Sequence, residues 1–83
     1  MDILYFAWVR ERIGMNGERI APPDGIVDVA GLIAWLVTRS PGHAEALADV
    51  SRLRVAIDQQ FAGLDAPIAG AVEIAIFPPV TGG

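Results

Sequence analysis

The sequence predicts an α+β fold, in which one sheet carries a single main helix across one of its faces. Three stretches support this prediction. Residues 72–77 alternate in the manner of a strand, residues 29–37 repeat apolar side chains at helical spacing, and residues 3–7 form a short apolar run. A chain of 83 residues has the length of one domain. We therefore expect one domain with strands near both ends of the sequence.

The first third of the chain predicts two strands around a short helix. Residues 3–7 include two aromatic side chains and are apolar on both faces, which favours a central strand. Residues 8–13 carry three charged side chains before Gly14, which is typical of a short helix ended by glycine. Residues 18–21 alternate weakly before a Pro-Pro-Asp-Gly turn. We expect them to form an edge strand antiparallel to the first.

The main helix is predicted to begin after Asp28, a favourable N-cap residue. Residues 40–42, Ser-Pro-Gly, end it because proline cannot continue the hydrogen-bond pattern. Trp35 falls at the border of the apolar stripe, where we expect it to cover the core. A second, shorter helix is predicted over residues 43–50, with His43 solvated in its first turn and no acid beside it. The stripe itself consists of Val29, Leu32, Ile33, Leu36 and Val37.

The C-terminal half predicts three more strands. Residues 53–58 and the very short run 61–62 are the first two, and a loop over residues 63–70 separates them from the last strand, residues 72–77. Period-two geometry sends Phe77 to the face opposite the main helix, where an aromatic beside the chain end is a candidate partner contact. An ordinary core role for it fits the pattern equally well. The residues expected to face the helix are Val72, Ile74 and Ile76.

Composition excludes several kinds of chemistry. The chain has no cysteine and a single histidine, so neither a disulfide framework nor a structural zinc site is expected. A net charge of −4 argues against nucleic acid as a partner and favours a basic protein surface. There is no glycine-rich phosphate loop, no apolar stretch of membrane-spanning length and no secretory signal pattern. We expect a cytoplasmic protein that binds no membrane and no metal.

The end of the chain is its most distinctive feature. Two prolines that cannot donate to a β-ladder follow the last strand, so we predict a folded domain over residues 1–77 and a tail over residues 78–83. The terminal Gly82 and Gly83 have no side chain and can enter a narrow channel. A carboxylate is a poor electrophile until it gains a leaving group. Because the chain has no nucleotide motif, another protein would have to activate it, and either sulfur or an amine could then attack the carbonyl.

Three segments match one family: residues 6–11, Phe-Ala-Trp-Val-Arg-Glu; residues 55–59, Val-Ala-Ile-Asp-Gln; and residues 73–83, which end in Phe-Pro-Pro-Val-Thr-Gly-Gly. Along its whole length the chain resembles the sulfur-carrier small subunits of molybdopterin synthase, the MoaD-type proteins of the ubiquitin-like β-grasp class. The last segment is the most specific. A bare Gly-Gly end would fit ubiquitin-like modifiers and thiazole-forming sulfur carriers equally well.

This resemblance implies a single mixed β-grasp sheet with its first and last strands parallel at the centre. It also implies a subunit that is not catalytic alone and binds no cofactor. In the family, an adenylyltransferase of the ubiquitin-activating type uses ATP and magnesium to adenylate the terminal glycine, which becomes a thiocarboxylate with sulfur from a donor protein. The tail then enters the large subunit of molybdopterin synthase, a transferase complex. There the sulfur is transferred to cyclic pyranopterin monophosphate in molybdenum cofactor biosynthesis.

Carried over by position, the resemblance assigns a role to each tail residue. Gly83 bears the adenylate and then the thiocarboxylate, Gly82 permits insertion, and Phe77 contacts the partner. The remaining residues of the inserted tail are Pro78, Pro79, Val80 and Thr81.

Two positions depart from the family pattern. Asp58 stands where members commonly have asparagine, and residues 69–73, Ala-Gly-Ala-Val-Glu, replace an acidic Asp-Gly-Asp-Glu turn. Both bear on affinity for the activating enzyme rather than on the chemistry. Two other functions fit the sequence: a ubiquitin-like modifier or sulfur carrier for another pathway, such as thiamine synthesis or thiolation, and an interaction module with an inert tail.

Overall fold

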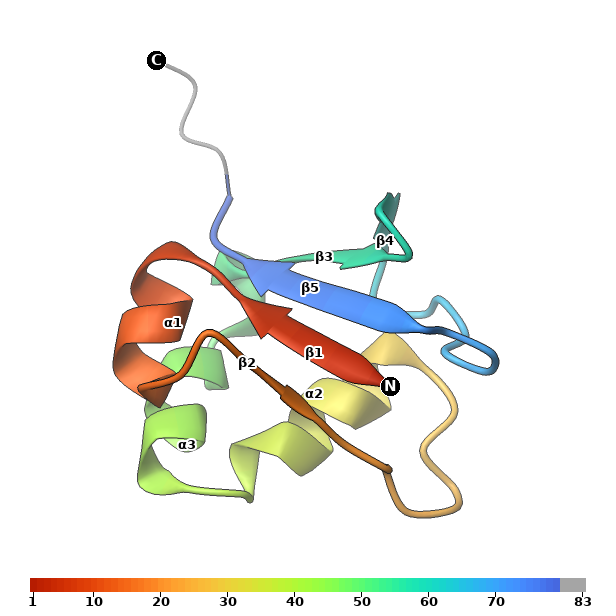
Figure 1. Cartoon of the computed structure of the whole chain (residues 1–83), viewed down its shortest axis with the longest axis horizontal. Coiled ribbons are helices and arrows are strands. Elements are labelled where there is room, and N and C mark those ends of the chain that lie inside the picture. The colour runs from red at the N-terminus through yellow and green to blue at the C-terminus, as the bar shows by residue number, and fades with distance from the viewer. Residues whose placement is uncertain (80–83) are drawn as a thin grey trace.

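Five strands form one mixed sheet in the order β2-β1-β5-β3-β4 in the computed structural model, which describes residues 1–79 (Figure 1). β1 and β5 lie parallel at its centre, and the other neighbouring strands are antiparallel. This confirms the α+β class, the parallel pairing of the first and last strands, and the edge position of the second. The strands are β1 (Asp2–Tyr5), β2 (Gly17–Arg19), β3 (Arg54–Ile57), β4 (Gln60–Ala62) and β5 (Glu73–Phe77).

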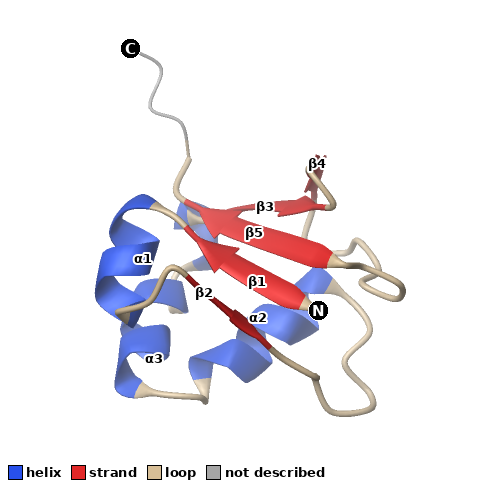
Figure 2. Cartoon of the chain, in the orientation of Figure 1, coloured by secondary structure: helices blue, strands red, loops and turns tan. Residues whose placement is uncertain are grey.

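Three α-helices and one 3-10 turn connect the strands (Figure 2). The helix α2 is the main helix predicted from the sequence, and its N-cap is Asp28, whose side chain accepts a hydrogen bond from the Gly31 N–H at 2.8 Å. Its apolar stripe packs against the aliphatic face of the central strands, where Ile3, Ile74 and Ile76 are fully buried. The elements are α1 (Ala7–Ile13), α2 (Val29–Val37), α3 (Pro41–Leu47) and η1 (Val50–Arg52).

Prediction and structure differ around the second helix. The helix α2 ends before residues 40–42, at Val37 with Thr38 as its C-cap, and those residues begin the next helix instead. Pro41 is the first residue of α3, a position where its missing N–H costs nothing. The Ser40 hydroxyl caps this helix by accepting from the His43 N–H at 3.1 Å. Residues 50–52 form a separate 3-10 turn. The predicted helix over residues 43–50 was therefore wrong at both of its ends.

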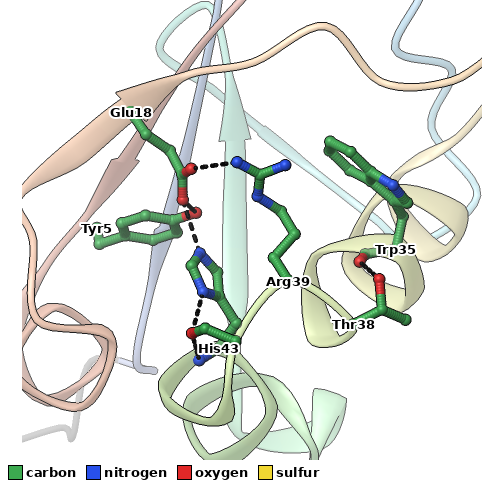
Figure 3. A network of polar contacts seen from close by, with 7 residues as sticks. Tyr5, Glu18, Trp35, Thr38, Arg39 and His43 are labelled. Atoms are coloured by element: carbon green, nitrogen blue, oxygen red, sulfur yellow. Dashed lines mark hydrogen bonds and ion pairs between the residues drawn. The ribbon is translucent and has the colours of Figure 1, made fainter.

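His43 is buried, with 3% of its surface exposed, so its prediction as a solvated residue without a partner acid was wrong. Its Nε2 lies 2.7 Å from a carboxylate oxygen of Glu18, and its Nδ1 lies 2.7 Å from the Ser40 hydroxyl (Figure 3). The Tyr5 hydroxyl donates to Glu18 at 2.8 Å, and Arg39 donates to the other carboxylate oxygen at 3.1 Å. These contacts join β1, β2 and the start of α3 to one another.

The Glu18 carboxylate is the common acceptor of this network. Its burial opposes the ionised form, but the hydrogen bonds from His43 and Tyr5 and the charge of Arg39 outweigh that effect and hold its pKa below the usual value. Burial and the same carboxylate raise the pKa of the Tyr5 hydroxyl, which therefore stays protonated. The network holds an ionised carboxylate between β1, β2 and the start of α3, and each of its two oxygens accepts at least one hydrogen bond.

Candidate functional site at the root of the tail

The chain leaves the sheet from its central strand. Phe77 is the last residue of β5 and pairs with Arg54 of β3, while Pro78 and Pro79 have no N–H with which to extend the ladder. Because β5 is bonded to strands on both sides, whatever follows it is attached to the most firmly held part of the fold. The predicted site residues Val80, Thr81, Gly82 and Gly83 lie outside the described residues, and their roles remain predictions.

Two aromatic rings lie beside this exit point. The Phe77 side chain is half-buried on the face away from α2, as its alternation predicted, and its ring centroid lies 6.0 Å from that of Phe61 in β4. Phe61 exposes 85% of its surface. Together with Arg54, Val55 and Ala62, the two rings line an open hollow of about 350 Å³. We call these five residues the tail-root surface.

A row of apolar residues crosses the sheet face next to the tail-root surface. The strand register sets Phe61 opposite Ala56, Ala56 opposite Ala75, and Ala75 opposite Leu4. These positions alternate with the buried ones, so their side chains point away from the helices. Because Ala56 and Ala75, in the middle of this row, have small side chains, the Phe61 ring projects beyond them. An exposed aromatic at the edge of an apolar face is typical of a protein-binding surface.

The β1–α1 junction brings another exposed aromatic to the same end of the sheet. The Phe6 N–H donates to the Ile76 carbonyl at 3.3 Å, and Phe6 exposes 45% of its surface. Ala7 follows with a φ of +53°, a left-handed conformation that costs an alanine about 1 kcal/mol or more. This strained residue begins α1 directly beside the end of β5. The junction therefore holds Phe6 close to the point where the tail begins.

Sequence reasoning selected Phe77 and the two prolines as site candidates and did not single out Phe61, Phe6 or Arg54, which the structure places beside them. Phe61 was read only as half of a very short strand. Its role follows from register, because the turn at Asp58 and Gln59 folds β4 back along β3 and sets Phe61 two strands from the tail. The sequence signal that could have located Phe61 is the turn at Asp58 and Gln59, because a tight turn there fixes which residues of β3 and β4 face each other.

The tail-root surface is mostly apolar. Its one ionisable side chain is Arg54, whose guanidinium donates to the carbonyls of Ser51 at 3.3 Å and Leu53 at 2.7 Å. Within residues 1–79, no group of three or more His, Cys, Asp or Glu side chains could hold a metal ion. No helix in that range is long and apolar enough to cross a membrane. The described surface offers shape and apolar area to a partner.

Comparison with known proteins places the chain in a family. The model of the ThiS family matches residues 3–83. The chain is 36% identical to the molybdopterin synthase sulfur carrier subunit of Escherichia coli, over 100% of this chain and 99% of that protein. It is 34% identical to the subunit of the same name from Haemophilus influenzae, again over 100% and 99%.

Solved structures agree with this placement. The crystal structure of small archaeal modifier protein 1 from Haloferax volcanii superposes with a TM-score of 0.75 at 28% identity, covering 96% of this chain and 97% of that one. It shares the ubiquitin-like β-grasp architecture. Family model, full-length relatives and fold agree, so this chain belongs to the ThiS family, among the molybdopterin synthase sulfur carrier subunits.

Proposed function

We propose that this chain carries sulfur on its C-terminal glycine for molybdenum cofactor biosynthesis. The observation that supports this most is the full-length match, at 36% identity, to a molybdopterin synthase sulfur carrier subunit, together with a family match that extends to Gly83. In the proposed cycle, a ubiquitin-activating-type adenylyltransferase adenylates the Gly83 carboxylate with ATP and magnesium. Sulfide-level sulfur supplied by a donor protein then attacks the carbonyl carbon, the bond from that carbon to the oxygen of AMP breaks, and a thiocarboxylate remains.

The large, catalytic subunit of molybdopterin synthase is the proposed recipient. The tail from Pro78 to Gly82 enters it, and the thiocarboxylate at Gly83 gives its sulfur to cyclic pyranopterin monophosphate. This chain supplies no catalytic side chain in the proposal. It contributes a reactive atom at the end of an arm that is anchored to the central strand of a rigid sheet.

The tail-root surface is the proposed dock for that partner. Phe61 and Phe77 present apolar area that water covers in the free protein, and its removal from water favours association. Docking there fixes where the arm begins.

Complementation tests the proposed function. In an E. coli strain that lacks its own sulfur carrier subunit, this chain should restore activity of molybdenum-cofactor-dependent enzymes, and a variant that lacks Gly82 and Gly83 should not. Equal rescue by the two forms would show that the tail is inert. If neither form rescues although both accumulate as folded protein, the test is repeated with the large subunit and activating enzyme from the source genome. Failure there contradicts the proposal.

A second candidate is a protein modifier, because the fold superposes on small archaeal modifier protein 1 at a TM-score of 0.75. In that case the activated Gly83 would form an amide with a lysine of another protein. Conjugates of this chain that survive denaturation and reduction, and whose tryptic peptides carry the fragment of residues 55–83 on lysine, would favour this reading, since Arg54 is the last residue at which trypsin cleaves this chain. Sulfur transfer without conjugates would favour the first.

A further inference from the structure

The six cations of the chain are all arginines, and the structure separates them into two groups. Two are paired: Arg19 lies 2.9 Å from Asp2, and Arg39 lies 3.1 Å from Glu18. The other four are exposed, and none has a carboxylate within ion-pair distance among the described residues. We call these four residues the basic surface; they are Arg10, Arg12, Arg52 and Arg54.

Trp8 orders the centre of this surface. The Arg12 guanidinium lies over the indole ring at 4.6 Å from its centroid, and the Arg52 guanidinium lies at 5.0 Å. Arg12 comes from α1, one turn after Trp8, while Arg52 comes from η1. Stacking on an aromatic ring restrains a long side chain without neutralising its charge. Two positive charges are therefore held in place before any partner arrives.

The basic surface lies at the tail end of the domain. Arg54 pairs with Phe77 across the ladder, and η1 ends two residues before it. α1 starts beside the end of β5, because β1 and β5 are parallel, and Figure 1 shows it at that end of the sheet. Among the carboxylates near these arginines, Glu11 lies on α1 between Arg10 and Arg12, and Glu45 and Asp49 lie on neighbouring segments. Asp49 accepts hydrogen bonds from the Ser51 N–H and hydroxyl.

Carboxylates gather at the opposite end. Asp2 and Glu73 are register partners at the starts of β1 and β5, Asp58 follows the end of β3, and Asp24 follows β2. Only Arg19 accompanies them there among the charged strand residues. The net charge of −4 is therefore unevenly distributed: among the described residues the tail end has four arginines against three carboxylates, whereas the opposite end has four carboxylates against Arg19.

We propose that the basic surface docks on an acidic patch that lies beside the tail channel of the molybdopterin synthase large subunit. This inference rests on the proposed function and adds an orienting contact to it. The tail itself ends in an anion, so a partner that binds it needs positive charge inside the channel. An acidic patch outside the channel would then attract Arg12 and Arg52. Two attractions of opposite sign fix the rotation of the carrier about its tail.

A role within the fold does not neutralise these charges, because stacking ties η1 to α1 but leaves Arg12 and Arg52 without a carboxylate partner among the described residues. Arg10 and Arg12 sit in the last turn of α1, where positive charge favours the helix dipole. That effect gives no reason for a second guanidinium from η1 on the same indole ring. The stack is a device for presenting charge outward, and its partner has negative charge.

Association kinetics with the large subunit from the same genome test the proposal. The variants are Arg12→Glu and Arg52→Glu, each studied singly, and the matched control is Arg19→Glu, which changes the net charge equally at the far end. At about 50 mM salt we expect each of the first two to slow association by about 3- to 10-fold, and the control to change it by less than about 2-fold. The difference should shrink at about 0.5 M salt, where the Debye length is only a few Å. Unchanged thermal melts would show that all variants fold.

Each outcome decides the matter. Equal effects of the three variants would show that only the net charge of the carrier matters, which would overturn the docking surface. Faster association of Arg12→Glu would show that the partner is basic at this position and would also overturn it. Binding of a labelled single-stranded RNA that Arg12→Glu weakens would assign the surface to nucleic acid and also overturn it. If the unmodified chain does not bind the large subunit at all, the proposed function itself fails. If the unmodified chain binds normally and the variants bind equally well, the docking surface is overturned while the proposed function stands.

Discussion

Replacing Phe61 with alanine should weaken binding to the large subunit strongly and alter folding little. The ring exposes 85% of its surface. If a phenylalanine offers roughly 200 Å², a partner that covers the exposed part removes about 170 Å² from water, which sets a ceiling of about 4 kcal/mol. Partial coverage is the usual case, so we expect a loss of about 1.5–3 kcal/mol, or about 10- to 150-fold in Kd.

The cost to folding should be small because Phe61 buries little of its surface within the chain. Its contact with Phe77 is the main interaction lost, which is worth about 0.5–1.5 kcal/mol. Calorimetric titration with the large subunit and a urea melt measure the two effects separately. The matched control is Val72→Ala, another exposed apolar residue, with 69% of its surface exposed at the far end of the sheet. If Phe61→Ala weakens binding no more than Val72→Ala does, the tail-root surface is not the dock.

Substitutions at three further positions test the physical account of the fold. Glu18→Gln should lower the free energy of unfolding at pH 7 by about 1.5–3 kcal/mol. The folded pKa of Glu18 lies below its ordinary value of 4.5, so its contribution to the free energy of unfolding is complete above pH 4.5 and is lost as the pH falls through the folded pKa. The stability of Glu18→Gln should therefore depend less on pH in that range than the stability of the native chain. Parallel pH profiles of the two proteins would contradict this. Ala7→Gly should raise stability by about 0.5–1 kcal/mol, since glycine accepts the positive φ freely, whereas Ala7→Val should lower it, and the opposite order in urea melts would refute the strain. Asp58→Asn should be nearly neutral because its amide oxygen can still accept from two backbone N–H groups and asparagine tolerates positive φ, while Asp58→Ala should cost about 1–2 kcal/mol; equal melting temperatures of these two variants would remove that explanation.

The elements with strong periodicity were predictable from sequence. The apolar stripe of α2 and the alternation of β5 fix both elements to within a residue, and the N-cap at Asp28 was confirmed. The side of the sheet taken by Phe77 followed from the same alternation. Local pattern is enough where one face is buried and the other is not.

What failed depends on contacts between distant parts of the chain. His43 reads as a surface residue because the carboxylate that makes its burial tolerable, Glu18, stands 25 positions earlier. The importance of Phe61 depends on strand order, which places β4 near the tail although the loop and all of β5 separate them in sequence. The left-handed Ala7 has no sequence signal, because alanine is not a residue that marks positive φ.

The most direct test of the proposed function is the intact mass of the chain after coexpression with its activating enzyme and a sulfur source. We predict a species heavier by one exchange of oxygen for sulfur, with fragmentation that assigns the exchange to Gly83. The same species should lose its sulfur when mixed with the large subunit and cyclic pyranopterin monophosphate. A chain whose mass stays unchanged while the activating enzyme is shown to turn over ATP on it would contradict the sulfur-carrier account.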